Sequence, residues 1–221
     1  MPITVIFEDA SLLVLDKPPG LLSVPGRGAD KQDCLSARTQ ARFPDALVVH
    51  RLDMATSGLM LMARGKAVQR ALGAAFASRA VHKRYIAVVD GALAPPVEDW
   101  GVIDLPIALD WPNRPLRVID ASLGKPSVTR WRVAQSAGLE ASSLAPGGAP
   151  ATRLELEPVT GRSHQLRVHL AAIGHPILGD ALYAPAAVQG RSSRLMLHAS
   201  KLALTHPQSG LRMQFQSAAP F

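Results

Sequence analysis

The strongest candidate for chemistry is the carboxylate of Asp53, which lies in the stretch His50-Arg51-Leu52-Asp53. No Asp or Glu occurs from Met54 to Val89, and the charged residues there are all basic: Arg64, Lys66, Arg70, Arg79, Lys83 and Arg84. Nearby cations favour the ionised form of a carboxylate. The same positive field would attract a polyanion and hold it against Asp53. The pattern therefore indicates a nucleophile placed at a phosphate-rich substrate, as in an enzyme that acts on nucleic acid.

A second polar cluster spans residues 161–170, which read Gly-Arg-Ser-His-Gln-Leu-Arg-Val-His-Leu. On a helix, His164 and His169 would point roughly 140° apart, because each residue turns the chain by about 100°. Helical zinc motifs use an i,i+4 spacing, so we reject a metal site. Arg162 and the free amides at the helix start could instead bind a phosphate, with Arg167 one turn after His164. A surface helix with solvated charges is the alternative for this cluster taken alone.

The other candidates also have purely structural explanations when each is considered singly. An isolated aspartate in a loop is commonly a helix cap or the partner of a neighbouring cation, here Arg51. Tyr85 alone is typical of a strand tyrosine with a buried ring and a hydroxyl in water. The functional hypothesis therefore depends on reading these residues together.

Composition and length narrow the class of protein. The chain has 221 residues, enough for one large domain or two small ones, with 24 Lys and Arg against 17 Asp and Glu. The tail after Asp180 contains no acid. Such basic faces indicate nucleic acid or an anionic membrane, and we favour nucleic acid because the charge clusters near the candidate residues. The single cysteine, Cys34, excludes an internal disulfide and suggests a reducing compartment. No signal peptide or membrane-spanning run is present, so we expect a cytoplasmic protein.

The elements that must position these residues follow from hydrophobic spacing. Helices are predicted at residues 34–42, 66–80 and 163–173, and loops with short strands at 92–123. Strands are predicted at residues 3–7, 12–15, 47–49, 59–63, 85–89, 130–134, 152–157, 195–198, 202–204 and 213–215. The strands at 130–134 and 152–157 should pair with one wet face. Residues 141–150 should form a hairpin tip. No linker divides two cores, so we expect one α+β domain over residues 1–221, with Asp53 in a connection between strands.

Read together, the motifs resemble the RluA family of pseudouridine synthases over nearly the whole chain. The matching stretches are Lys17-Pro18-Pro19-Gly20, His50–Asp53 with Thr56–Leu59, Lys83-Arg84-Tyr85, Gly161–His169, Gly174–Asp180 and Leu195–Ala199. The resemblance implies a catalytic domain with a mixed, mainly antiparallel central sheet flanked by helices and loops. Many relatives carry an additional N-terminal S4 domain, and we expect none here because the chain starts at the first catalytic strands.

The family isomerises uridine in RNA by breaking the glycosidic C–N bond, turning the uracil and forming a C–C bond, without a cofactor or a metal. The resemblance implies that Asp53 is the catalytic aspartate, that Arg167 forms an ion pair with it, and that Tyr85 packs on the target base. Arg51 corresponds to the residue that fills the space left by the flipped nucleotide. The motifs further imply RNA contacts by His50, Thr56, Arg162, His164 and Leu197.

The short form, with Leu21–Arg27 and Asp110–Pro115, resembles the dual-specificity type within the family. That type modifies stem-loops of large-subunit (23S) rRNA and of the tRNA anticodon arm, and we expect the chain to act on both as a monomer. Two alternatives stay open at this point. The chain could be a non-catalytic RNA-binding protein on the same scaffold, or a synthase of the same family with a different rRNA target.

Overall fold

The computed structural model describes residues 3–134 and 149–221, which divide into two compact units. Unit 1 contains the chain up to Lys83 together with residues 198–220, and unit 2 contains residues 84–197 with Phe221. The hairpin tip expected at 141–150 lies outside the described residues except for its last two. The expectation of a single domain over 1–221 stays a prediction.

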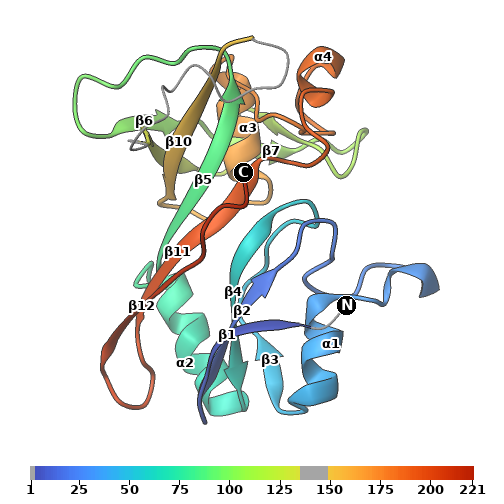
Figure 1. Ribbon diagram of the computed structural model, residues 1–221, viewed down its shortest axis with the longest axis vertical. Helices are drawn as coiled ribbons and strands as arrows, with labels where there is room; N and C mark the ends of the chain where they lie inside the picture. Colours follow the sequence, from blue (N-terminus) through green and yellow to red (C-terminus); the bar gives the residue numbers. More distant parts are fainter. Residues whose placement is uncertain (1–2, 135–148) are drawn as a thin grey trace. The chain divides into compact units, whose positions relative to one another are not determined.

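Unit 1 is built on a mixed sheet (Figure 1). Its strands follow the order β1-β2-β4-β11, while β3 also pairs with β4 and β12 with β11. Only the pairing of β4 with β11 is parallel among these described pairs. The strands are β1 (Thr4–Glu8), β2 (Leu12–Lys17), β3 (Ala46–Val48), β4 (Ser57–Arg64), β11 (Leu197–Thr205) and β12 (Arg212–Gln216).

The core of unit 1 is centred on β4. Residues Leu59 to Ala63 of this strand are buried, and α2 (Lys66–Ala77) packs Val68 and Leu72 against them. The helix α1 (Leu35–Arg42) follows the short 3-10 helix η1 (Ala29–Lys31) and packs beside β3 (Figure 1). Burying one such aliphatic side chain contributes about 1.5–3 kcal/mol. The start of β4, immediately after the Asp53 loop, is therefore firmly anchored.

Unit 2 contains an antiparallel sheet of order β5-β10-β9-β6 and a separate hairpin of β7 and β8. Its helices are α3 (Gln165–Ala172) and the short α4 (Ala186–Gln189). Its strands are β5 (His82–Asp90), β6 (Gly101–Asp104), β7 (Ile107–Leu109), β8 (Arg117–Ile119), β9 (Val128–Val133) and β10 (Ala151–Pro158). The first two residues of β5 belong to unit 1, and the first residue of β11 belongs to unit 2.

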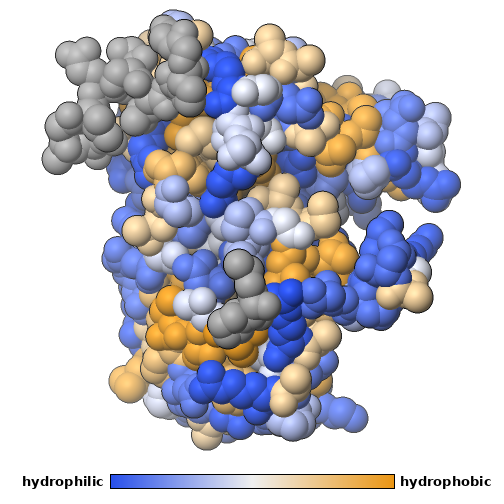
Figure 2. All heavy atoms as spheres, turned by 45° about the vertical axis from the view of Figure 1, so that its right-hand side comes forward, coloured by the Kyte–Doolittle hydropathy of each residue, from blue (hydrophilic) through white to orange (hydrophobic). Residues whose placement is uncertain are grey.

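The structure confirms the α+β fold class with a mixed, mainly antiparallel sheet. It corrects the late strands: residues 195–198 and 202–204 were expected as two strands, but β11 runs without interruption from Leu197 to Thr205. The residues between them, Ala199 to Lys201, include no Gly or Pro that would break the ladder. Hydrophobic residues reach the face seen in Figure 2 in patches bordered by hydrophilic residues. Among the described helices, none combines the length and hydropathy needed to cross a membrane.

Candidate active site

The Asp53 loop, residues 50–56, leads into β4 and is held by the last residue of β2 and by the segment that follows this strand. Lys17 is fully buried, and its ammonium group donates to the carbonyl oxygens of Pro18, Leu21 and Met54 at 2.9, 2.8 and 3.0 Å. An ammonium group has three donors, so these carbonyls can use them all. Since Met54 directly follows Asp53, the buried lysine fixes one side of the candidate aspartate.

The other side of Asp53 is fixed by Ser23. Its hydroxyl donates to the carbonyl of Leu52 at 2.7 Å and accepts the N–H of the same residue at 3.0 Å. The N–H of Thr56 donates to the carbonyl of Asp53 itself at 3.1 Å. The backbone is thus bonded on both sides of Asp53, while the Asp53 side chain stays half-buried and Arg51 is exposed. This arrangement presents a carboxylate from a rigid loop, as a nucleophile requires.

His50 has a defined structural contact at the start of the loop. Its Nε2 accepts the N–H of Leu61 in β4 at 2.9 Å, and its ring lies 4.7 Å from that of Phe76. Burial, with a smaller contribution from the charge of Lys83, lowers the pKa of His50 from 6.5 to about 3. Burial also lowers the pKa of Lys83. His50 is therefore neutral near pH 7, and its proposed contact with RNA stays a prediction.

A chain of hydrogen bonds, buried at its Ser57 end, joins the start of β4 to β11. Ser57 lies 2.9 Å from Nδ1 of His198, and Nε2 of His198 lies 3.1 Å from the hydroxyl of Ser217. That hydroxyl donates to the carboxylate of Asp16 at 2.7 Å. The adjacent Gly58 has φ +107°, and a Cβ there would collide with the backbone of Ala199. Together these contacts set the register of β4 just beyond the Asp53 loop.

In unit 2, Arg167 lies on α3 and forms a buried ion pair with Asp180. The guanidinium donates from Nε and Nη2 to the two carboxylate oxygens at 2.7 and 2.5 Å. Only 4% of the Arg167 side chain and 0% of the Asp180 side chain are exposed. A bidentate pair of this kind fixes both the position and the plane of the guanidinium.

Tyr183 connects Arg167 to His164. Its ring lies 5.1 Å from the Arg167 guanidinium, and its hydroxyl lies 2.6 Å from Nδ1 of His164. His164 has φ 57° and precedes α3, so the helix begins two residues later than the expected start at 163. Arg162 is exposed, with a 3.4 Å bond to the carbonyl of Pro126. The structure thus brings Arg167 and His164 together through a tyrosine for which the sequence motifs gave no role.

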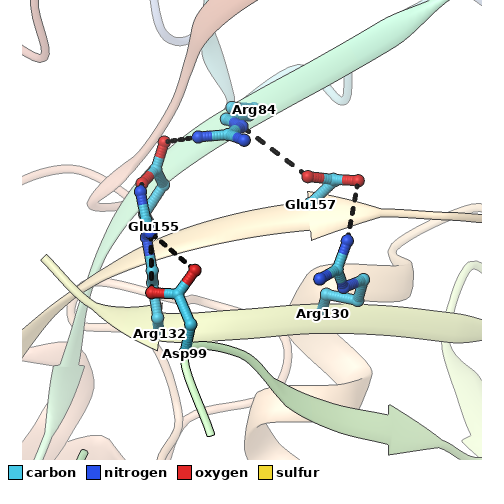
Figure 3. A network of polar contacts seen from close by, with 6 residues as sticks. All are labelled: Arg84, Asp99, Arg130, Arg132, Glu155 and Glu157. Carbon is cyan, nitrogen blue, oxygen red and sulfur yellow. Dashed lines mark hydrogen bonds and ion pairs between the residues drawn. The ribbon is translucent and has the colours of Figure 1, made fainter.

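Tyr85 is buried in β5, directly opposite Leu156 of β10. The preceding Arg84 pairs with Glu155 at 2.8 Å and with Glu157 at 3.6 Å (Figure 3). The expected wet face of the β9–β10 pair therefore carries an ion-pair network, which Arg130, Arg132 and Asp99 extend. Because Arg84 is held to two positions on β10, the strand that carries Tyr85 is fixed in register.

The remaining candidates are placed as follows. Thr56 is buried at the end of the Asp53 loop, and Leu197 is buried at the start of β11. Within residues 3–134 and 149–221, no three His, Cys, Asp or Glu side chains gather as a metal site. Sequence reasoning gave no role to Lys17, Ser23 or Asp180. One available signal was that Asp180 is the last acid of the chain and ends a family motif.

Comparison with known proteins decides the family. The model of the RNA pseudouridylate synthase family matches residues 11–172. A Yersinia pestis protein described as dual-specificity RNA pseudouridine synthase RluA is 46% identical over 217 residues, covering 98% of this chain and 99% of that protein. The chain belongs to the RluA family of pseudouridine synthases.

Further relatives agree with this assignment. The Escherichia coli K12 protein with the same description is 43% identical over 99% of this chain and 94% of its own. The solved structure of human RNA Pseudouridylate Synthase Domain Containing 1 superimposes with a TM-score of 0.77, at 30% identity over 99% of this chain and 84% of that one. The prediction of an RNA-modifying isomerase is thereby confirmed, and RNA is its substrate.

Proposed function

We propose that this RluA-family enzyme converts uridine to pseudouridine in stem-loops of two kinds of RNA, large-subunit (23S) rRNA and the tRNA anticodon arm, with Asp53 as the catalytic carboxylate. The observation that carries the catalytic assignment is that the backbone is hydrogen-bonded on both sides of Asp53, by Ser23 at Leu52 and by Lys17 at Met54, while the Asp53 side chain is half-buried. The description "dual-specificity" in relatives at 43–46% identity supports the two kinds of target. Because both RNAs are cytoplasmic in bacteria, we propose a cytoplasmic enzyme, and we expect it to act as a monomer.

In this proposal the reaction begins with cleavage of the bond between C1′ of the ribose and N1 of uracil. Asp53 either attacks C1′ or assists departure of the uracil through a glycal-like intermediate. The detached uracil turns, C5 bonds to C1′, and the hydrogen on C5 is lost as a proton while N1 gains one. The atoms therefore balance without an oxidant, a reductant or a cofactor.

Arg167 and Tyr85 complete the proposed catalytic set. The bidentate bond to Asp180 fixes the position and the plane of the Arg167 guanidinium. We propose that Arg167 forms an ion pair with Asp53, which would keep that carboxylate ionised and aimed. Tyr85 is proposed to pack on the target base and to accept the C5 proton, since a phenol can both stack and exchange a proton. Its register, fixed through Arg84, supports a positioned role.

The catalytic assignment is tested by tritium release from RNA labelled at uridine C5. We expect Asp53→Asn to abolish release, because the amide can neither attack C1′ nor carry the negative charge. Asp45→Asn is the matched control, since Asp45 is an exposed aspartate of the same unit that pairs with Arg64 at the surface. Tritium release by the Asp53→Asn protein, at a rate near that of the control, would show that another group performs this step.

The proposed role of Arg51 is tested separately. A uridine inside a stem-loop must leave its stack, at a cost of a few kcal/mol, and a planar guanidinium can occupy the vacated space. We expect Arg51→Ala to slow turnover of a folded stem-loop about 10- to 100-fold and to affect unstructured RNA much less. Arg42→Ala, at another exposed arginine of unit 1, is the control. Equal effects of Arg51→Ala on the two RNAs contradict a role in base flipping.

A further inference from the structure

Trp111 is the one exposed aromatic residue in the part of the chain that the structure describes. Its side chain is 64% exposed, whereas the other tryptophans, Trp100 and Trp131, are half-buried. Tryptophan is enriched at interfaces, because it combines a large apolar ring with a polar N–H, so Trp111 is a candidate contact residue. Trp111 lies in the stretch Asp110–Pro115 that resembles the dual-specificity type, and no catalytic or RNA-binding role is assigned to it above.

The indole of Trp111 is stacked with a cation on one of its faces. The guanidinium of Arg114 lies over the indole, 4.5 Å from its centroid. An aromatic ring has two faces, and the 64% exposure of Trp111 leaves much of its surface open to a further stacking partner. A flat, electron-rich face backed by a cation suits an unpaired base, because bases stack on tryptophan whatever their identity. Arg114 at the same time offers a cation to the adjacent phosphate.

The loop that carries Trp111 is locally rigid. Between β7 and β8, the N–H of Asp110 donates to the carbonyl of Leu116 at 3.1 Å, and the N–H of Leu116 donates to Asn113 at 3.0 Å. The carboxylate of Asp110 accepts the backbone N–H and the side-chain amide of Asn113. Trp111 therefore stands on a closed turn, and stacking a base on it would require little ordering of the chain.

The hairpin is bonded directly to the cluster around Arg167. The N–H of Arg117, the first residue of β8, donates to the hydroxyl of Tyr183 at 3.0 Å. That tyrosine contacts both His164 and the Arg167 guanidinium. The Trp111 turn is thus coupled, within unit 2, to the α3 motif for which RNA contacts are proposed. A nucleotide on Trp111 would belong to the RNA held there.

We infer that Trp111 and Arg114 form a stacking site for an unpaired base of the substrate RNA other than the isomerised uridine. The site binds a flanking nucleotide of the loop through the indole face and its phosphate through the guanidinium. It contributes to RNA affinity and takes no part in the chemical step. The inference uses the family's RNA substrate and does not depend on which stem-loops are modified.

Steady-state kinetics on bulk rRNA and tRNA labelled with tritium at uridine C5 provide the first test. Loss of one base–aromatic stack should raise KM of Trp111→Ala about tenfold, with kcat within about twofold of the native value. Trp111→Phe keeps an aromatic face and should raise KM less than about threefold. Val97→Ala is the control, because Val97 is a fully exposed apolar side chain of unit 2. A KM of Trp111→Ala within twofold of the control overturns the inference.

Fluorescence provides a second test that is independent of turnover. Stacking of a base on Trp111 should quench its emission when unlabelled RNA is added. We expect quenching in the native and Val97→Ala proteins and its loss in Trp111→Phe. Persistence of the full quench in Trp111→Phe, or concentration-dependent dimerisation through Trp111 in place of RNA binding, overturns the inference. If the native enzyme fails on the two proposed stem-loops but the bulk-RNA results hold, the proposed targets are wrong and the stacking site stands.

Discussion

Removing one partner of the ion pair between Arg167 and Asp180 should cost far more stability than breaking other Arg–Asp pairs of unit 2, because both side chains are buried. Removing one partner of such a pair typically costs about 3–5 kcal/mol, since the other charge loses its compensation. We expect Asp180→Asn to lower the free energy of unfolding by this amount. Asparagine keeps Oδ1 for the N–H groups of Leu182 and Tyr183, but the amide NH2 that replaces Oδ2 cannot accept the bond from Arg167 Nε, so the substitution removes the charge and one hydrogen bond.

Asp99→Asn is a closely matched control. Asp99 also accepts hydrogen bonds from an arginine of unit 2, with Arg132 Nη1 at 3.0 and 3.2 Å, but its side chain is 74% exposed. Exposed ion pairs contribute about 0.2–1 kcal/mol. The two variants therefore make the same chemical change in two environments, and burial alone predicts a severalfold difference in the free energy lost.

Urea denaturation followed by tryptophan fluorescence is the suitable assay, because Trp100, Trp111 and Trp131 all belong to unit 2. With a urea m-value of about 2 kcal/mol per molar, Asp180→Asn should lower the unfolding midpoint by about 1.5 M or more. Asp99→Asn should lower it by less than about 0.5 M. Equal shifts would mean that other groups compensate the Arg167 charge, and the reasoning from burial would be refuted.

Three other predictions concern unit 1. The depressed pKa of His50, about 3, means that the unfolded chain gains a proton below pH 6.5 that the folded chain does not. The native protein should thus lose about 2 kcal/mol more stability from pH 7 to pH 5 than His50→Gln, and equal losses in urea titrations followed by circular dichroism would contradict this. Gly58→Ala should destabilise the protein by about 3 kcal/mol or more, because Gly58 has φ +107° and its new Cβ would collide with the backbone of Ala199. Gly73→Ala in α2 meets open space and should stabilise the protein by about 0.5–1 kcal/mol. Thermal unfolding of the two variants measures the difference. Arg70→Gln, on the exposed side of α2, should reduce the slope of log Kd for RNA against log salt by about one, and an unchanged slope excludes a phosphate contact there.

Hydrophobic spacing predicted most elements because they bury continuous apolar faces. The stripe of Val68 and Leu72 in α2, and the apolar run from Leu59 to Ala63 in β4, are buried as expected. The predictions that failed, a divided late strand and an early start of α3, fall where the hydrophobic spacing gives no signal. The small residues Ala199 and Ser200 interrupt the run of large apolar residues, and the sequence alone does not show whether the strand continues through them. One strand, β11, was therefore predicted as two. The α3 start depended on the left-handed backbone of His164, which a side-chain pattern does not encode.

The candidate site was predictable in its motifs but not in its supporting contacts. The residues that fix the Asp53 loop act through backbone carbonyls, and a carbonyl has no residue type that a sequence pattern could reveal. Ser23, for example, forms hydrogen bonds with the N–H and C=O of Leu52, which lies 29 residues later in the sequence. Similarly, Tyr183 meets His164 across 19 positions. Such contacts depend on the fold as a whole, so only coordinates can identify them.

Two lysines of unit 1 have different structural roles because one is buried and the other is exposed to solvent. Lys17 and Lys66 are both lysines beside a strand or helix end, yet one is fully buried among carbonyls and the other is exposed. Moving a charge out of water is costly unless its hydrogen bonds are replaced, so a buried lysine persists only where several carbonyls converge on it. Convergence of that kind exists only when the backbone around Asp53 has one conformation. The buried ammonium group therefore both requires and enforces the geometry of the loop that presents the proposed catalytic carboxylate.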